Sequence, residues 1–384
     1  MTKITSDSLK TVQADFELLH LENINQHREW IENNCQRINS WRKAAEAKDP
    51  RGQHLLALCH GFGLGLPENK TEAYKLFRKA AEQGLSQAQY VLGICYYFGE
   101  GVNKNEKQGF KWYCKAAEQG HAEAQFKVGC CFAAGHMCEE DKKEAAKWIL
   151  KSAEQGHAEA QFVIGNFYNN GDGVEEDKAS AADWYRKSAE QGNANAQDKL
   201  GDFYCFGDGV EEDKVSAADW YRKAAEQGNP NSQHMLGEFY FYGEGGLKEN
   251  HKEAVKWIRK SAEQGFADAQ HKLGLIFFHG RGVNKDHKEA VKWIHKSAEQ
   301  GHPDAQTTLE VAYREGYGVK KDPKKSVKWC RKAAEQGNAE AQFNLGIHYY
   351  AGDGVEEDLK EAIRWIRMAA EQGHEAAINF LLED

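Results

Sequence analysis

Apolar residues recur along this chain at the three- and four-residue spacing of an amphipathic helix, and they do so in pairs of segments. In residues 157–192, a first stripe formed by Ala160, Ile164 and Tyr168 predicts one helix. The turn at residues 171–173 contains two glycines, which readily adopt positive φ and interrupt this helix. The second stripe consists of Ala181, Trp184, Tyr185, Ser188 and Ala189. Gly192 follows as a helix cap, so the segment is predicted to be a helical hairpin.

The same hairpin pattern repeats along most of the chain. The tetrapeptide Ala-Glu-Gln-Gly occurs nine times, with its glycine at positions 84, 120, 156, 192, 228, 265, 301, 337 and 373. Seven of the intervals are 36 residues long and one is 37. Self-similarity at such a period is typical of stacked repeats. We therefore predict an all-α solenoid of about nine helix-turn-helix repeats with a helical cap at each end.

A glycine lies in the middle of the first helix of most copies, at positions 93, 129, 165, 201, 237, 274 and 346. Because a mid-helix glycine costs about 1 kcal/mol relative to alanine, we expect it to permit a close approach between helices. An aromatic residue three positions later, and a tryptophan in the second helix, are expected to fill the space between neighbouring hairpins. These tryptophans are Trp112, Trp148, Trp184, Trp220, Trp257, Trp293, Trp329 and Trp365.

Three motifs in these copies carry a family resemblance. The last copy has Ala-x-Ala-Gln-x-x-Leu-Gly-x-x-Tyr at Ala339–Tyr349, Gly-x-Gly-Val at Gly352–Val355, and Glu-Ala-x-x-Trp, closing with Ala-Ala-Glu-Gln-Gly, at Glu361–Gly373. This pattern resembles Sel1-like repeats, which are relatives of tetratricopeptide repeats. The resemblance covers roughly residues 49–373 and implies a right-handed α-superhelix that serves as an adaptor or scaffold. Sel1-like proteins are not, as a class, enzymes.

The repeat register predicts the domain organisation. Residues 1–48 form an N-terminal helical cap and residues 374–384 a C-terminal capping helix. The nine repeats between them are residues 49–84, 85–120, 121–156, 157–192, 193–228, 229–265, 266–301, 302–337 and 338–373. The N-terminal cap carries two amphipathic stripes, which are Leu9, Val12, Phe16 and Leu19, and Ile31, Cys35, Ile38 and Trp41. Whether this part only caps the stack or also binds something stays open.

Composition and charge narrow the classes of partner. The 384 residues are 41% hydrophobic and include only five prolines, which favours a single elongated repeat domain. The formal net charge is −9 and no basic run occurs, which argues against nucleic acid or an anionic membrane as a partner. Residues 1–20 contain no long apolar run, so we expect neither a signal peptide nor a transmembrane helix. The expected location is the cytoplasm, with export by another route left open.

One cysteine-rich cluster could in principle bind a metal. Cys130, Cys131, His136 and Cys138 together offer four nitrogen or sulfur ligands of the kind zinc takes. Their spacing matches no common zinc motif, and Cys131 and Cys138 stand where other copies have apolar residues. We therefore expect buried thiols rather than a metal site, and we expect no cofactor.

Acidic and histidine residues also recur near the expected helix starts. Acidic triplets precede several second helices, at residues 139–141, 175–177, 211–213 and 356–358. They lack the alternating ligand spacing of a calcium loop and indicate solvated turns that begin a helix. Four histidines follow a closing glycine and are expected to begin first helices; these are His121, His157, His302 and His374.

Binding is expected at the positions that vary between copies. By the tetratricopeptide resemblance, the inner face is lined by first-helix residues one, four and five positions after the mid-helix glycine. The predicted groove residues are Tyr97, Phe98, Asn166, Asn169, Asn170, Asp202, Phe206, Glu238, Phe241, Tyr242, Phe278, His279, Arg314 and Tyr350. Exposed aromatic anchors beside side-chain amides suit an extended peptide or a partner helix. For Arg314, pairing with Glu310 and Glu315 within the protein is favoured over capture of a partner carboxylate.

These observations predict a non-enzymatic scaffold that binds a peptide or a partner protein along the inner groove. One alternative is a solenoid-based enzyme or cell-wall-ligand binder, for which Asp202, His234 and Glu238 are the polar neighbours to consider. A second alternative is a self-associating regulatory protein whose groove is filled by its own residues 7–20. The identity of the partner, the pathway and the oligomeric state do not follow from the sequence.

Overall fold

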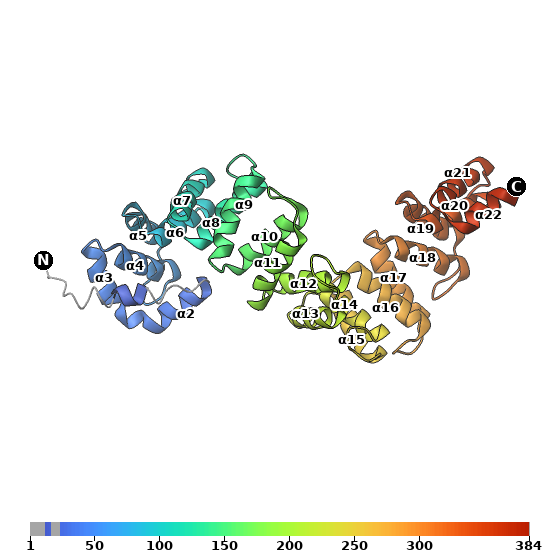
Figure 1. The fold of residues 1–384 in the computed structure, drawn as a ribbon, viewed down its shortest axis with the longest axis horizontal. Helices are drawn as coiled ribbons and strands as arrows, with labels where there is room; N and C mark the ends of the chain where they lie inside the picture. Colours follow the sequence, from blue (N-terminus) through green and yellow to red (C-terminus); the bar gives the residue numbers. More distant parts are fainter. Residues whose placement is uncertain (1–11, 17–23, 384) are drawn as a thin grey trace. The chain divides into compact units, whose positions relative to one another are not determined.

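The computed structural model describes residues 12–16 and 24–383, and in these ranges the chain is all helical with no strand. It divides into two compact units, residues 1–191 and residues 192–384. Within each unit the helices follow one another as hairpins in chain order (Figure 1). The predicted solenoid of helical hairpins is confirmed. The outer residues of the predicted stripe at Leu9 and Leu19 lie outside the described residues.

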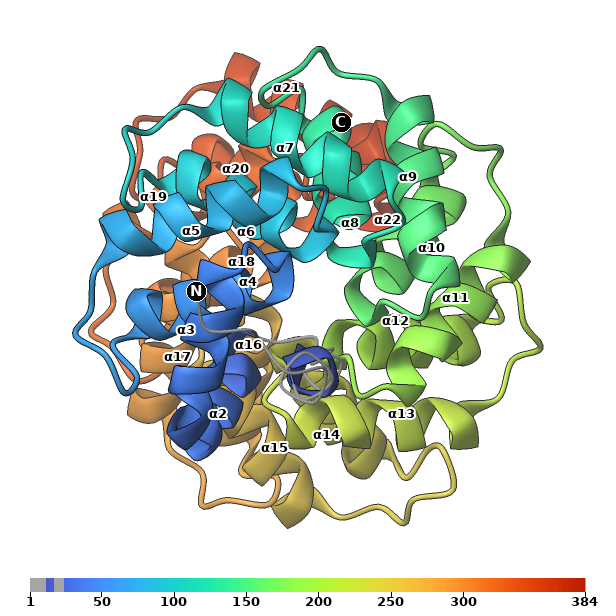
Figure 2. The same cartoon turned by 90° about the vertical axis from the view of Figure 1, so that its left-hand side faces the viewer.

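In residues 1–191, a helical turn at residues 12–16 precedes the first labelled helix. The elements that follow are α2 (Ile24–Asn34), the 3-10 helix η1 (Cys35–Arg37), α3 (Ile38–Glu46), α4 (Pro50–Phe62), α5 (Lys70–Glu82), α6 (Ser86–Phe98), α7 (Glu106–Glu118), α8 (Ala122–Ala134), α9 (Lys142–Glu154), α10 (Ala158–Asn170) and α11 (Lys178–Glu190). In this unit α6, α8 and α10 form an inner row, and α7, α9 and α11 form an outer row (Figure 2).

In residues 192–384, the helices are α12 (Ala194–Phe206), α13 (Lys214–Glu226), α14 (Pro230–Tyr242), α15 (His251–Glu263), α16 (Ala267–His279), α17 (His287–Glu299), α18 (Pro303–Glu315), α19 (Pro323–Glu335), α20 (Ala339–Ala351), α21 (Leu359–Glu371) and α22 (Glu375–Glu383). We call the first helix of each hairpin helix A and the second helix B. The extra residue in the copy that closes at Gly265 is absorbed by the loop, where Gly245 and Gly246 both have positive φ.

Side-chain caps explain where the helices begin. Helix α10 begins after His157, whose Nδ1 accepts a hydrogen bond from the backbone N–H of Ala160 at 3.0 Å. The other three predicted histidines cap α8, α18 and α22 in the same way. Helix α11 begins after Asp177, whose carboxylate accepts bonds from two backbone N–H groups. The acidic triplets are therefore helix-starting turns, as predicted.

The mid-helix glycines mark the closest approach of the two helices in a hairpin. A Cβ added at Gly274 would lie 2.4 Å from Cγ1 of Ile294 and 3.0 Å from the carbonyl oxygen of Ala290. Both residues belong to the facing helix B, so even a methyl group would force the helices apart. The expectation that these glycines permit close packing is confirmed.

The tryptophans of helix B lie between neighbouring hairpins. Trp148 packs against the cluster of Ala116, Ala124 and Val128, which belongs to the preceding hairpin and to its own helix A. Lysine ammonium groups three residues later lie over these rings, for example Lys151 at 4.2 Å from the ring centroid of Trp148. The rings from Trp257 onward are buried and the earlier four are half-buried. The structural interpretation of the tryptophans is confirmed.

Glutamine pairs join the two helices of a hairpin, and in at least seven copies the helix A glutamine also bonds to the preceding helix B. In α16, the Gln270 side-chain amide donates to the Ala262 carbonyl of α15 at 3.0 Å. Its oxygen accepts a hydrogen bond from Gln300 at the end of α17 at 2.8 Å. Gln300 belongs to an Ala-Glu-Gln-Gly motif, and an equivalent glutamine pair occurs in every copy. This relay explains why both glutamines recur.

Replacing Gln270 with leucine is expected to lower the free energy of unfolding by about 1–3 kcal/mol. It removes one of the donors to the buried Ala262 carbonyl, which keeps its bond from the Gly265 N–H, and it removes the acceptor of the Gln300 amide. Urea unfolding of the full chain measures the change. The exposed Lys288→Leu substitution on α17 is the control and is expected to stay within about 0.5 kcal/mol of the native chain. Equal values for the two variants would contradict the structural role of the relay.

Candidate partner-binding groove

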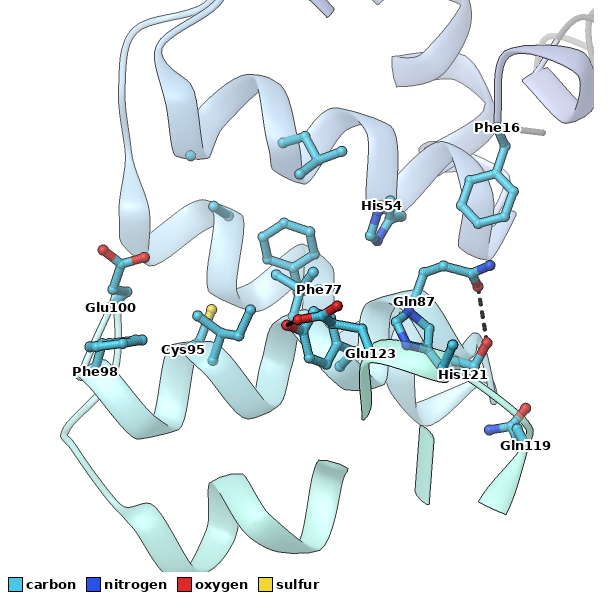
Figure 3. A pocket seen from close by; sticks show the side chains of 18 of the residues that line it. Phe16, His54, Phe77, Gln87, Cys95, Phe98, Glu100, Gln119, His121 and Glu123 are labelled. Atoms are coloured by element: carbon cyan, nitrogen blue, oxygen red, sulfur yellow. Dashed lines mark hydrogen bonds between the residues drawn. The ribbon is translucent and has the colours of Figure 1, made fainter. Parts of the chain in front are cut away.

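A groove of about 850 Å³ lies along helix A residues of the first unit, and we call it groove 1. The mid-helix position, which is a glycine in most copies, is Ala57 in the first copy and Gly93 in the second. The walls of groove 1 include Leu58 and Ile94, one position after it, and Phe62 and Phe98, five positions after it. Figure 3 shows Phe16 and His54 at one end of groove 1, and Phe98 and Glu100 at the other. These two registers are among the positions that the tetratricopeptide resemblance assigns to the inner face.

The charged groups on the rim of groove 1 pair with one another. Lys70 contacts Glu100 at 2.9 Å. Glu123 accepts a 3.2 Å hydrogen bond from the Tyr90 hydroxyl and lies 2.6 Å from Nε2 of His157. Burial acts to raise the pKa of Glu123, but the hydrogen bond and charge of His157 bring that pKa below its usual value. Groove 1 therefore offers a ligand a mainly apolar surface.

A smaller cavity of about 340 Å³ lies in the second unit, and we call it groove 2. Leu275 and Val311 line it from the register one position after the mid-helix site. Phe278 and His279 line it from the registers four and five positions after that site. The Phe278 ring stacks on the His287 ring, with centroids 4.6 Å apart. Phe278 and His279 thus line a cavity, and their role in binding a partner stays a prediction.

Three predicted aromatic residues share one register and are strongly exposed. Phe98, Phe206 and Tyr242 each stand five positions after the mid-helix glycine and are 66%, 67% and 57% exposed. Large exposed aromatic side chains are enriched in protein-binding surfaces. Tyr350 is also exposed, and its ring lies edge-on to Phe380 of the C-terminal helix α22. Tyr97 is half-buried against Phe98.

The predicted polar groove residues already have partners in the protein. Asn166 accepts a hydrogen bond from the Tyr185 hydroxyl at 2.8 Å, and Asn169 donates to its neighbour Asn170. Asp202 accepts from the Tyr221 hydroxyl at 2.8 Å and also pairs with Lys199. The two tyrosine bonds tie helix A to helix B of the same hairpin, whereas the other two contacts lie within one helix A. A role in holding a partner's backbone stays a prediction for these residues.

Two further residues depart from the prediction or complicate it. Phe241 is only 5% exposed and belongs to a core cluster, so its assignment as a surface anchor is wrong. The ammonium group of Lys272 lies 4.4 Å from the centroid of the Phe241 ring and also contacts the Glu238 carboxylate at 2.9 Å. A long side chain from the next helix A therefore covers Phe241, and it occupies one oxygen of Glu238.

Arg314 pairs inside the protein, as favoured from the sequence. Its guanidinium contacts Glu310 at 2.7 Å and Glu315 at 3.1 Å. Glu310 replaces the mid-helix glycine and is fully buried. It also lies near His348 and Ser326, which approach Oε1 to 3.3 and 3.2 Å. Arg314 is therefore part of a buried polar network rather than an open carboxylate receptor.

The cysteines do not form the considered zinc site. Cys131 is buried, whereas the Cys138 sulfur faces the His136 carbonyl oxygen at 3.8 Å. Burial raises the pKa of the Cys131 thiol to about 12, so it stays protonated at neutral pH. Within residues 12–16 and 24–383, no group of three or more histidine, cysteine, aspartate or glutamate side chains could hold a metal ion.

Several residues that line groove 1 were missed from the sequence. Tyr90 and Val91 stand three and two positions before the mid-helix glycine, and Glu123 belongs to the following copy. Tyr90 lies four residues before Ile94, which is one helical turn, so the helical period could have placed it on the same face. Glu123 could not be found that way, because its position depends on the packing of the next hairpin.

The fold and the grooves define a helical-repeat protein of the tetratricopeptide-like class. The Sel1 repeat model matches nine segments, which are residues 50–85, 86–121, 122–157, 158–193, 194–229, 230–266, 267–302, 308–338 and 339–374. The chain therefore belongs to the Sel1 repeat family. In the described part of the chain, no helix has both the length and the apolar character that spanning a membrane requires.

Two solved structures are similar over most of the chain. One is c5321, described as a protective antigen present in uropathogenic Escherichia coli strains and displaying an SLR fold. It is 34% identical, covers 98% of this chain and 89% of its own, and has a TM-score of 0.57. The other is a Sel1 repeat protein from Oxalobacter formigenes, which is 32% identical, covers 80% of this chain and 89% of its own, and has a TM-score of 0.63. A comparison with curated proteins found no match.

Proposed function

We propose that this Sel1 repeat protein is a non-enzymatic scaffold that binds a protein or peptide partner along helix A of its hairpins. The observation that carries the proposal is the shared register of three exposed aromatic residues, Phe98, Phe206 and Tyr242. Phe98 also lines groove 1, and groove 2 is lined by His279, which stands at the same register in the second unit. Because exposed aromatic side chains beside an apolar cavity are costly to leave in water, a partner that covers them gains binding free energy.

The polar groups of the described residues support a binding role more than a catalytic one. Ser326, His348 and Asp353 approach each other, with Ser326 Oγ 3.4 Å from His348 Nε2 and the Asp353 carboxylate 3.8 Å from Nδ1. Ser326 is fully buried, so a substrate could not reach its hydroxyl. Of the polar neighbours considered for an enzyme, Asp202 and Glu238 are paired, and burial lowers the pKa of His234.

The cysteines indicate the cellular compartment of the proposed scaffold. All nine are free thiols, and most are buried or half-buried among apolar residues. Free cysteines in such numbers suit a reducing compartment, because an oxidising one favours disulfides. We therefore place the proposed scaffold in the cytoplasm. Host cell fractionation with an antibody to the chain would test this location.

Partner capture with matched variants tests the binding surface. The triple variant Phe98→Ala, Phe206→Ala and Tyr242→Ala is expected to weaken binding of a captured host protein by about a hundredfold or more, because each anchor contributes about 1–2 kcal/mol and each 1.4 kcal/mol is a factor of ten. The control, Val215→Ala with Leu359→Ala, truncates exposed apolar residues of helix B and is expected to bind like the native chain. Equal capture by all three chains would place the partner on another surface.

A further inference from the structure

The chain's own residues 12–16 lie against the first hairpin at one end of groove 1. Phe16 is a wall of groove 1 together with Leu58 and Tyr90. Its ring meets the His54 ring edge-on, with centroids 5.6 Å apart, and His54 in turn meets Phe77 at 5.3 Å. Val12, one helical turn earlier, is fully buried in the same core cluster. A short amphipathic helix is thus inserted where a groove ligand would begin.

The contact has a polar component that an ordinary apolar cap does not need. Asp15 is 0% exposed and accepts a 2.9 Å hydrogen bond from the Trp41 indole N–H. The Arg37 guanidinium pairs with the same carboxylate. A buried carboxylate is tolerated only when it is paired and hydrogen-bonded, so α3 and η1 supply a matched receptor for this acid. The first hairpin and the helices before it thus contact an acidic residue and the aromatic residue that directly follows it.

Residues 12–16 are helical, and their position is set by contacts with the first hairpin. In proteins most helical stability comes from tertiary packing of an amphipathic face. The turn is therefore held by the contacts of Val12, Asp15 and Phe16 with the first hairpin. Residues 12–16 can therefore be regarded as a tethered intramolecular ligand of the first hairpin.

We propose that residues 12–16 are an exchangeable ligand of this site, and that the same residues of a second copy of the chain bind there when the intramolecular contact opens. We call the site the Asp-Phe site and define its receptor side as Arg37, Trp41, His54 and Phe77. The second copy fits because it carries the same Val-x-x-Asp-Phe sequence. Exchange of one element between identical chains is a common route to a dimer.

The intramolecular segment would also set how tightly the Asp-Phe site accepts an external helix. A tethered ligand has an effective concentration in the millimolar range, so it excludes weak competitors. If the intramolecular contact is closed ten times as often as it is open, binding from outside is weakened about elevenfold. This inference does not rest on the proposed partner along the rest of the grooves, because its ligand is the chain's own sequence.

Binding of a fluorescent peptide of residues 7–20 to the full chain tests the proposal by anisotropy. The double variant Asp15→Asn with Phe16→Ala weakens the attached ligand and leaves the receptor intact, so it is expected to bind the peptide at least tenfold more tightly than the native chain. Adding Arg37→Ala to this variant is expected to abolish the gain, because the receptor loses its cation. A peptide with the same two substitutions is the matched control and is expected not to bind.

Two outcomes would overturn the proposal. Equal binding of the peptide by the native chain and the double variant would show that residues 12–16 do not compete for the site. Failure of both chains to bind would show that the contact is a structural cap only. If the double variant does not fold, as judged by circular dichroism, Asp15→Asn alone replaces it with the same expected direction. Sedimentation of the native chain is expected to show a concentration-dependent dimer that the double variant lacks.

Discussion

Replacing Arg314 with leucine is expected to lower the free energy of unfolding of residues 192–384 by about 3–5 kcal/mol, because Glu310 would be left as a buried charge without a cation. The remaining neighbours of Glu310 cannot replace it. Ser326 and Asn344 are neutral, and Nε2 of His348 lies 3.3 Å from Oε1 of Glu310, farther than the guanidinium at 2.7 Å. Urea unfolding gives the total change, and hydrogen exchange in α18–α20 locates it.

Two comparisons isolate the charge effect of Arg314. Arg364→Leu removes an exposed arginine that pairs with Glu361 on α21, and it is expected to cost less than about 0.5 kcal/mol. In a Glu310→Gln background, Arg314→Leu is expected to cost about 1 kcal/mol, because a neutral amide is much cheaper to bury than a carboxylate. A cost for Arg314→Leu that matches the Arg364→Leu control would show that Glu310 is not held by this pair.

Replacing Gly318 with alanine is expected to cost about 2–5 kcal/mol. Gly318 has φ +70°, where an alanine is strained by about 1–2 kcal/mol. Its added Cβ would also lie only 2.0 Å from the His287 carbonyl oxygen at the start of α17, and overpacking of this kind adds about 1–3 kcal/mol. Thermal and urea unfolding of the full chain measure the total.

Gly301→Ala separates the two causes in the Gly318 prediction. Gly301 has φ +95°, but a Cβ at that position meets no atom within 4 Å. It is therefore expected to show the backbone strain without the clash, and to cost about 1–2 kcal/mol. If Gly318→Ala were no more costly than Gly301→Ala, the loop would not press against the start of α17 in solution.

The hairpins and their caps could be predicted because their signals are local. The helical period, the closing glycine and a capping side chain all lie within one copy, and comparison of the copies separates the required positions from the variable ones. Glu310 was visible as a departure from the glycine pattern for the same reason. Its pairing with Arg314 was favoured from the sequence, but its contact with His348 was not visible, because His348 comes from the following hairpin.

The exposure of the predicted groove residues, which stand one, four and five positions after the mid-helix glycine, could be predicted only in part. Phe206 and Phe241 are both aromatic residues near the end of a helix A, yet one is 67% exposed and the other is buried. The two residues stand at different registers, five and four positions after the mid-helix glycine. Tyr242, at the register of Phe206, is also exposed, and Cys205, at the register of Phe241, is also buried. Lys272 and Arg281 in the next hairpin add further cover over the Phe241 ring. Such coverage depends on side chains about 30–40 residues away, and no local pattern in helix A reports it.

The glutamine relay has a consequence for how the length of such a chain can change. Every bond in the relay is made within one hairpin or to the hairpin just before it. The loss or gain of one whole copy would therefore remove or add a complete set of bonds and leave no partner unmatched. Recombination between copies can therefore change the number of hairpins in steps of 36 or 37 residues and keep this relay complete, whereas specific contacts between neighbouring hairpins, such as that of Glu310 with His348, would have to be repacked.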